Sequence, residues 1–186
     1  MTSKYQSRLS VGQVINHKWK LLETIGQGAF GEIFRCECIA IPRGKRCCVG
    51  MHVAVKVERD DSDEIEPDLP PRRTALRIEA IVLKKLQSNP QVPRYYEFGS
   101  DPDLKINYLC MELLGPSLMQ LRRLVRNNRF SHAYILSIGL QVLLTLWKMH
   151  DLGVLHRDIK PSNIVVGRSC DLASRKVNLL KFLISI

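Results

Sequence analysis

The chain has 186 residues, of which 45% are hydrophobic and 25% are charged, and its formal net charge at pH 7 is +10. This composition is that of a globular protein and excludes a mainly disordered chain. The length suits about one domain, at roughly 100–200 residues per domain. No apolar run reaches the roughly 18 residues that cross a bilayer, so we expect no membrane partner.

The positive charge is unevenly distributed along the chain. Residues 58–68 hold seven acids and one arginine, a net charge of −6, which leaves +16 on the remainder. A basic surface suits a protein substrate that is acidic or pre-phosphorylated, and it also suits nucleic acid. We rank nucleic acid low because the sequence offers no aromatic stacking platform and no nucleic-acid-binding motif. A solvated basic face without a dedicated partner is an equally good interpretation.

The cysteine content indicates a reducing compartment. The polar start of the chain, residues 1–9, predicts no signal peptide, and six cysteines in such a chain predict free thiols. We therefore expect a cytoplasmic protein, with the nucleus as the alternative. Four of the cysteines lie close together, at Cys36, Cys38, Cys47 and Cys48. Their spacing lacks the two-residue gap that is usual for zinc ligands, so we interpret them as buried thiols on strands.

The first third of the chain predicts an antiparallel sheet. After a loose polar arm, apolar and polar residues alternate from Trp19 to Val57. Turn residues interrupt this alternation at 26–31 and 42–45, so we predict three antiparallel strands. Residues 58–71 are acidic and contain proline, which predicts a loop that buries little surface.

A glycine-rich turn at residues 26–31, with the letters GQGAFG, lies between the first two of these strands. Glycines let the backbone approach phosphate oxygens and present N–H groups to them. Alone, the pattern also fits a flexible hairpin or a dinucleotide-binding turn. A dinucleotide turn opens into a helix, whereas residues 32–36 have the pattern of a strand. Residues 53–56 then form a short apolar strand that ends in Lys56, which is either a solvated lysine or a phosphate contact.

A helix and two further strands follow. Residues 74–87 place Leu76, Ala80 and Leu83 three and four positions apart, which predicts an amphipathic helix. Glu79 lies in the middle of this helix, where a lone glutamate normally faces solvent. Residues 90–98 and 105–112 predict two more strands and thus a five-stranded sheet.

Two helices are predicted in the second half of the chain. The first, at residues 118–129, carries four arginines: Arg122, Arg123, Arg126 and Arg129. Their three- and four-residue spacing gathers several on one side, where substrate contact and plain solvation are equally good interpretations. Ser131 can cap the second helix, which runs to about Leu152 and stops at Gly153. Its narrow polar stripe and wide apolar surface predict a helix inside a helical lobe.

Residues 156–163, His-Arg-Asp-Ile-Lys-Pro-Ser-Asn, carry the strongest chemical signal. The apolar pairs at 154–155 and 164–165 predict two short buried strands that hold these residues as a rigid loop. Asp158 can accept the proton of an incoming hydroxyl, Lys160 can neutralise charge on a moving phosphoryl group, and Asn163 can ligate magnesium. A phosphoryl-transfer site needs these three groups at one place. A polar loop that only joins two strands is the alternative.

This loop resembles the catalytic loop of protein kinases, and the earlier motifs occur in the kinase order. Residues 111–118, Met-Glu-Leu-Leu-Gly-Pro-Ser-Leu, resemble the segment that connects the two lobes in the casein kinase 1 superfamily. The spelling of the loop and of residues 79–87 is most similar to the tau-tubulin kinase branch. The resemblance implies an α+β, protein-kinase-like fold. It would have a five-stranded antiparallel N-lobe sheet with one main helix, and an incomplete helical C-lobe.

The resemblance also implies a domain organisation and a nucleotide site. An arm (1–18) would precede an N-lobe (19–111), a hinge (112–117), a partial C-lobe with the catalytic loop (118–180) and a non-matching tail (181–186). Lys56 would contact the ATP phosphates and pair with Glu79. Met111 would guard the adenine pocket, and the backbone of Glu112 and Leu114 would hydrogen-bond adenine. The other residues implied at the nucleotide are Ile25, Gly26, Gly28, Gly31, Ile33 and Ala54.

The resemblance breaks where kinases place the motif Asp-Phe-Gly. Phe182 is in register, but Lys181 replaces the metal-binding aspartate and Leu183 replaces the glycine. A protonated lysine only donates and cannot ligate magnesium. We expect a chain truncated before this motif, with a true pseudokinase as the alternative.

The sequence therefore predicts, by family, a protein serine/threonine kinase that transfers a phosphoryl group from ATP to protein hydroxyls. ATP and Mg²⁺ are the implied ligands, with Asn163 in an incomplete metal site. We expect the 186-residue chain itself to be inactive. The alternative is a non-catalytic, pseudokinase-like fragment that binds nucleotide or serves as a scaffold.

Overall fold

The computed structural model describes residues 9–28, 31–40, 48–59, 75–167 and 180–183. The chain divides into two compact units, one made of residues 1–80 and 95–113 and the other of residues 81–94 and 114–186. The division at 113–114 lies inside the predicted hinge. Residues 81–94, which the sequence assigned to the N-lobe, group with the second unit.

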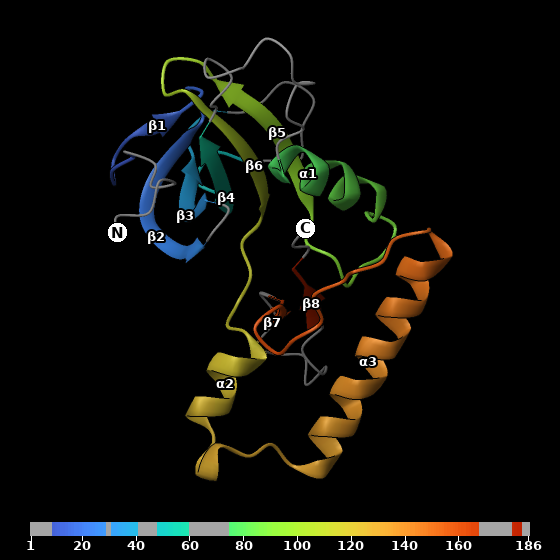
Figure 1. Cartoon of the computed structure of the whole chain (residues 1–186). Helices are drawn as coiled ribbons and strands as arrows, with labels where there is room; N and C mark the ends of the chain where they lie inside the picture. Colours follow the sequence, from blue (N-terminus) through green and yellow to red (C-terminus); the bar gives the residue numbers. More distant parts are fainter. Residues whose placement is uncertain (1–8, 29–30, 41–47, 60–74, 168–179, 184–186) are drawn as a thin grey trace, which may run out of the picture. The chain divides into compact units, whose positions relative to one another are not determined.

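The first unit contains a six-stranded antiparallel sheet (Figure 1). In order of pairing, its strands are β1 (Val14–Ile15), β2 (Trp19–Gly28), β3 (Gly31–Cys38), β4 (His52–Arg59), β6 (Ile106–Glu112) and β5 (Tyr95–Asp101). The predicted antiparallel sheet is confirmed, with one more strand than predicted.

The extra strand, β1, lies within the predicted arm and is held by buried polar contacts. Ile15 is fully buried in the core. Asn16 donates through its backbone N–H to Asp101 Oδ2 at 2.7 Å and through its side chain to the Tyr108 hydroxyl at 2.6 Å. That hydroxyl donates in turn to Glu97 Oε1 at 2.7 Å. Residues 14–16 therefore belong to the sheet rather than to an arm.

One face of the sheet forms the core of this unit. Alternate residues of β3 and β4 are buried there, including Cys36, Cys38, Val53 and Val55. Burial raises the pKa of the Cys36 thiol to about 12, so this thiol stays protonated at neutral pH. Cys36 and Cys38 are thus buried thiols on a strand, as predicted, whereas Cys48 is exposed and Cys47 lies outside the described residues.

Strand β5 starts later than the strand predicted at residues 90–98. Pro90 and Pro93 have no N–H to donate to a neighbouring strand. The amides of Gln91 and Val92 donate instead to Asn89, to its side-chain and backbone oxygens. Residues 89–93 therefore form a local turn, and pairing begins at Tyr95.

The helices confirm the predicted order but differ in extent. They are α1 (Ala75–Lys85), α2 (Leu118–Leu124), the short 3₁₀ helix η2 (Arg126–Asn128) and α3 (His132–Asp151). The predicted helix at 118–129 is broken because Val125 is extended and Asn127 and Asn128 have φ of 58° and 51°. Asparagine tolerates this left-handed conformation better than most residues.

Helix α3 begins where predicted, since the Ser131 side chain accepts from the Tyr134 N–H at 3.2 Å. The covered side of this helix is mixed in character. Met149 and Thr145 are fully buried, and the Gln141 side chain accepts from the Leu180 N–H at 3.0 Å. Several other large apolar side chains are exposed, including Leu136 at 74%. The described residues therefore cover only part of the wide apolar surface of α3.

The second unit also contains a two-stranded antiparallel sheet of β7 (Ile164–Val166) and β8 (Leu180–Phe182). The predicted strand at 164–165 is confirmed, but no strand forms at 154–155, where Leu155 is 64% exposed. The amides of Gly153 and Val154 bond to carbonyls at the end of α3, and Gly153 has a φ of 68°. These residues terminate the helix and are not available to a strand. Within the described residues, no helix is long and apolar enough to cross a membrane.

Candidate active site

The glycine-rich turn lies at the end of the hairpin formed by β2 and β3. Gly28 pairs with Gly31 and Gly26 pairs with Ile33, while residues 29 and 30 lie outside the described part. Gly31 has a φ of 126°, and a Cβ there would lie 2.0 Å from the Val57 carbonyl oxygen. A side chain at this position would clash with the neighbouring strand, so packing within the sheet alone requires a glycine here.

Lys56 and Glu79 form the ion pair that the resemblance implied. Lys56 lies on β4, beside Ile33 of β3, and its Nζ is 2.5 Å from Glu79 Oε2 on α1. Both side chains are largely buried, and burial raises the pKa of Glu79 while the Lys56 ammonium lowers it. The glutamate therefore faces inward, and its usual position in solvent is excluded. A lysine held in this way presents a fixed positive charge at the edge of the hairpin.

The predicted adenine residues lie at the end of the sheet and just after it. Ala54 and Met111 are buried and paired across β4 and β6, and Glu112 ends β6. Ile25 is exposed at 46%. Leu114 belongs to the second unit and is half-buried. Each unit thus carries its own share of the predicted nucleotide residues.

The second half of the predicted hinge is tied to the second unit by its backbone. Gly115 N–H donates to the Val166 carbonyl at 2.8 Å, and Val166 N–H donates to the Pro116 carbonyl at 3.0 Å. A Cβ on Gly115 would lie 2.9 Å from that Val166 oxygen, closer than a Cβ normally approaches. The glycine is needed here for close backbone packing.

The predicted catalytic loop brings its three polar groups together. Lys160 Nζ lies 2.7 Å from Asp158 Oδ2, and Asn163 Nδ2 donates to the same oxygen at 2.8 Å. Asn163 Nδ2 also donates to the Asp158 carbonyl at 2.9 Å. The Asn163 amide group is thereby oriented, with its oxygen as the atom suited to a cation. The predicted convergence of these side chains is confirmed.

The charge on Asp158 is stabilised by these neighbours. The hydrogen bond from Lys160 contributes most to lowering the pKa of Asp158, and the Asn163 bond also lowers it. The carboxylate is therefore ionised at neutral pH and able to accept a hydrogen bond from a hydroxyl. Arg157, the preceding residue, has a φ of 64°, a strained conformation of a kind that often occurs at functional loops.

Lys181 and Phe182 are both packed into the second unit. Lys181 is 8% exposed on β8, and its Nζ donates to the Val92 carbonyl at 3.3 Å. Phe182 is fully buried and its ring meets His156 edge to face, with centroids 6.2 Å apart. Burial lowers the pKa of His156, so the ring is neutral at neutral pH. The predicted tail thus begins as a packed strand.

The donor set for magnesium fits only in part. Asn163 offers one amide oxygen, and the Asp158 carboxylate is engaged by Lys160. Position 181, where the family resemblance would place a metal-binding carboxylate, holds the buried Lys181. Within the described residues, no group of three or more His, Cys, Asp or Glu could hold a metal ion. We therefore derive no chemical step through magnesium.

Two residues that position the site were not predicted. Gln91 accepts from the Phe182 N–H at 2.9 Å, and its side chain donates to the Gln141 carbonyl at 3.3 Å. Gln141 in turn accepts from Leu180, so both glutamines anchor β8. The sequence signal that could have indicated this role is Gln141, a glutamine within an apolar helix. A buried amide group needs hydrogen-bond partners, so such a residue suggests a contact with another segment.

Comparison with known proteins identifies the family. The family described as protein kinase domain matches residues 19–177. This chain belongs to the protein kinase domain family. A probable serine/threonine-protein kinase of Dictyostelium discoideum is 40% identical over 158 residues. The matched region covers 85% of this chain and 28% of the relative. Casein kinase I homolog 2 of Saccharomyces cerevisiae is 30% identical over 172 residues, 91% of this chain and 27% of the relative.

The matched region is a small part of these relatives. A second probable serine/threonine-protein kinase of Dictyostelium discoideum is 30% identical over 81% of this chain, but only 11% of that protein is covered. The match to this chain thus covers between 11% and 28% of the length of each of these three relatives. Its membership of the kinase family is established, and ATP and Mg²⁺ use are general properties of that family.

Proposed function

We propose that this chain carries the catalytic loop of a protein serine/threonine kinase of the casein kinase 1 superfamily, in the tau-tubulin kinase branch. The substrate would be a hydroxyl of a protein that is acidic or pre-phosphorylated. The observation that carries the proposal is the convergence of Asp158, Lys160 and Asn163 through contacts of 2.7–2.8 Å. The 30% identity to a casein kinase I homolog supports the superfamily.

Each residue has a role that follows from its chemistry. The ionised Asp158 orients the substrate hydroxyl and accepts its proton, and Lys160 stabilises charge on the transferring group. Asn163 is the residue suited to a metal by its amide oxygen. Lys56, fixed by Glu79, would contact the ATP phosphates.

The proposed nucleotide site uses the residues that the resemblance implied. The glycines of the hairpin leave room for phosphates, and the apolar side chains contact the base and ribose. The proposed set is Ile25, Gly26, Gly28, Gly31, Ile33, Ala54, Met111, Glu112 and Leu114.

We further propose that these 186 residues bind ATP weakly and do not turn it over. The reason is Lys181, a buried cation in place of the carboxylate that completes the metal site. The parts of a phosphoryl-transfer site do not substitute for one another, because catalysis depends on positioning and charge stabilisation together. The same observation favours a second candidate function, a nucleotide-binding scaffold without catalysis.

Two assays on the full chain test these proposals. ATP binding is titrated with and without magnesium, using Lys56→Met and, as a matched control, the exposed Lys20→Met. We expect weak binding that magnesium improves little and that Lys56→Met alone reduces. Absence of ATP binding by the unmodified chain would overturn the nucleotide site.

The second assay measures transfer of radiolabelled phosphate from ATP to casein and to an acidic peptide, with Asp158→Asn as the control. We expect no transfer from the unmodified chain, which together with ATP binding supports the scaffold function. Transfer that Asp158→Asn removes would instead support the kinase chemistry and refute the proposed inactivity.

We also propose a cytoplasmic protein, with the nucleus as the alternative. The support is chemical: the described cysteines are free thiols, as a reducing compartment maintains them.

A further inference from the structure

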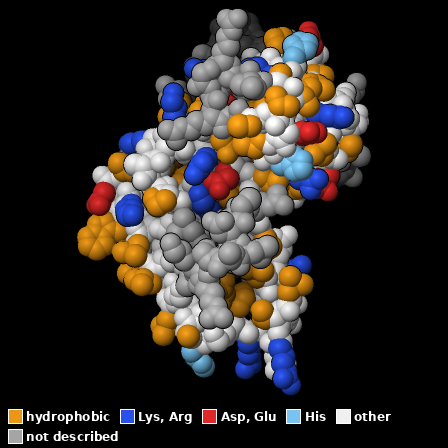
Figure 2. All heavy atoms as spheres, turned by 180° about the vertical axis from the view of Figure 1, so that it is seen from behind, with side chains coloured by type: hydrophobic (Ala, Val, Ile, Leu, Met, Phe, Trp, Pro, Cys, Tyr) orange, Lys and Arg blue, Asp and Glu red, His pale blue; other side chains and the backbone are white. Residues whose placement is uncertain are grey.

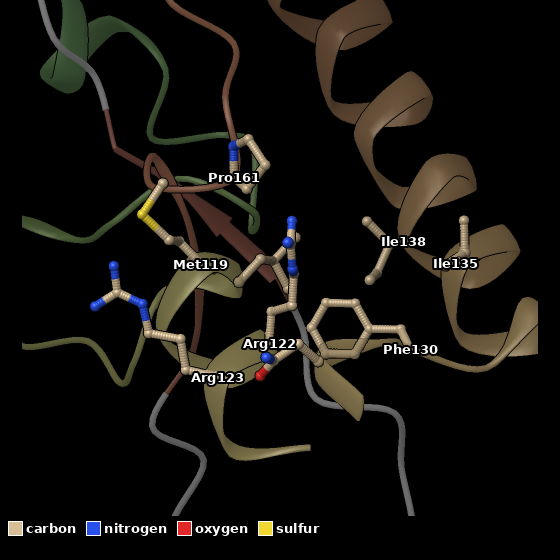
Figure 3. A pocket seen from close by; sticks show the side chains of 9 residues that line it. Met119, Arg122, Arg123, Phe130, Ile135, Ile138 and Pro161 are labelled. Carbon is tan, nitrogen blue, oxygen red and sulfur yellow. The ribbon is translucent and has the colours of Figure 1, made fainter. Parts of the chain in front are cut away.

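A hollow in the second unit lies outside the proposed catalytic groups. It is formed by α2, η2, the start of α3 and Pro161, and it has a volume of about 570 Å³ (Figure 3). Its lining includes the side chains of Leu118, Met119, Ile135 and Ile138. Leu118 and Ile138 also belong to the core around β7 and β8, so this side of the hollow is supported by packed residues.

Two arginines border this apolar lining. Arg122 and Arg123 of α2 line the hollow, and Figure 3 shows their side chains extending from that helix in different directions, with Arg123 directed away from Ile135 and Ile138. A second hollow of about 530 Å³ shares Arg122, Phe130 and Ile135 with the first and adds Arg129. The two hollows therefore form one surface, which we call the arginine groove.

No carboxylate among the described residues pairs with the arginines of the arginine groove. No aspartate or glutamate occurs in the sequence between Glu112 and Asp151. Within the described residues, the arginines at 122, 123, 126 and 129 form no ion pair with a carboxylate. All four are exposed. Figure 2 shows Lys and Arg side chains projecting at the bottom of the view, beside hydrophobic ones.

We propose that the arginine groove docks an acidic segment of a partner protein that also carries one aliphatic or aromatic side chain. The guanidinium groups would bind carboxylates in paired hydrogen bonds, which suits Arg better than Lys. The apolar side chain would fill the lining formed by Met119, Ile135 and Ile138. A desolvated apolar anchor ringed by polar contacts is the usual arrangement of an energetically dominant interface contact.

Two other anionic partners fit the groove less well. A nucleic acid backbone would pair with the arginines but would leave the aliphatic lining unfilled. A flat anionic membrane surface would meet the rim without entering the hollow. Docking needs neither ATP nor Asp158, so its test is independent of the proposed function.

The test measures binding of a fluorescent, glutamate-rich peptide with one central leucine to the full chain without nucleotide. We expect Arg122→Glu combined with Arg123→Glu to weaken binding about tenfold, and Ile135→Ser to weaken it severalfold. The matched controls on α3, Lys148→Glu and Leu136→Ser, should change affinity by less than about twofold, because neither residue lines the groove. Replacing the peptide leucine by serine should weaken binding as Ile135→Ser does.

Two further measurements test the proposal even if one of these variants folds poorly. A lysine-rich peptide with the same leucine should bind the doubly reversed variant better than it binds the unmodified chain. A photoreactive leucine analogue on the acidic peptide should cross-link the unmodified chain at Met119, Phe130 or Ile135.

Several outcomes would overturn the proposal. These are equal binding of a glutamine-rich peptide, equal loss with Lys148→Glu, and cross-links outside the groove. Tighter binding of a single-stranded oligonucleotide or of anionic vesicles through Arg122 would assign the groove to that partner instead.

Discussion

Lys181 is held in its buried position on β8 by its amine. The residue is 8% exposed, and its Nζ donates to the Val92 carbonyl. The position therefore suits a hydrogen-bond donor. A carboxylate introduced there would place two acceptors against each other in a buried site.

We predict that Lys181→Asp lowers the free energy of unfolding by about 3 kcal/mol relative to Lys181→Met, because a carboxylate buried without a partner is strongly destabilising. Urea denaturation measures both variants. Lys84→Met, on an exposed part of α1, is the control for loss of a lysine. If the Asp and Met variants unfolded within about 1 kcal/mol of each other, the Lys181 amine would have to lie in solvent.

A second prediction concerns the protonation of Asp158. The hydrogen bond from Lys160 is the largest cause of the lowered pKa of Asp158. The substitution Lys160→Met should therefore raise this pKa toward 3.8, the ordinary value of an aspartate. Because the folded pKa lies below the unfolded one, the contribution of Asp158 to stability is present above pH 3.8 and is lost as pH falls through the folded pKa. Carbon-13 NMR titration of the carboxyl group measures the shift. An unchanged pKa in Lys160→Met, with Lys148→Met as control, would show that the contact does not persist in solution.

Among the elements, β1 is linked to the rest of the sheet in part through a buried hydroxyl. Tyr108 links Asn16 to Glu97, so Tyr108→Phe removes one acceptor and one donor from buried partners. We predict a loss of about 1–3 kcal/mol in unfolding free energy and faster hydrogen exchange at residues 14–16. Tyr134→Phe, in the second unit, is the control and should change neither. Undiminished protection at residues 14–16 in Tyr108→Phe would show that strand pairing alone holds β1.

The elements also show what the sequence could and could not predict. Alternation of apolar residues from Trp19 to Val57 identified β2, β3 and β4, and a serine cap located the start of α3. The misplaced elements depend on the local backbone conformation of a few residues. The turn at Asn89 delayed β5, the extended Val125 ended α2, and the C-terminus of α3 took up the Val154 amide.

The contacts among the candidate site residues were predicted more completely than the bounds of the elements that carry them. Asp158, Lys160 and Asn163 are close in sequence, so one loop brings them together. Lys56 and Glu79 were paired only through the family resemblance, since spacing alone does not join a strand to a helix. The anchoring of β8 by Gln91 and Gln141 depends on contacts between distant segments, which no local pattern reveals.

For the whole molecule, the exposed side of α3 governs behaviour in solution. Leu136, Leu143 and Trp147 are 74%, 62% and 64% exposed, and contiguous apolar patches commonly drive association. We predict concentration-dependent self-association in sedimentation velocity. Leu136→Gln combined with Leu143→Gln should weaken it about tenfold, because both carry apolar area on this helix.

The control for this prediction is Leu155→Gln, since Leu155 is equally exposed at 64% but follows the helix. It should leave association unchanged. A monodisperse monomer at every concentration tested would contradict the prediction.

Gly31 has a consequence for how inherited variation in such a chain would be understood. Judged by sequence alone, an allele that replaces this glycine would be classed as a change in the glycine-rich motif. In the structure, however, the Cβ of the new side chain would lie 2.0 Å from the Val57 carbonyl oxygen and would disturb the packing of the sheet. The first effect in a cell would be on the amount of folded protein, since quality control removes unstable chains. A phenotype at Gly31 would therefore report protein dosage, and it would resemble a null allele even in a chain that never bound a nucleotide.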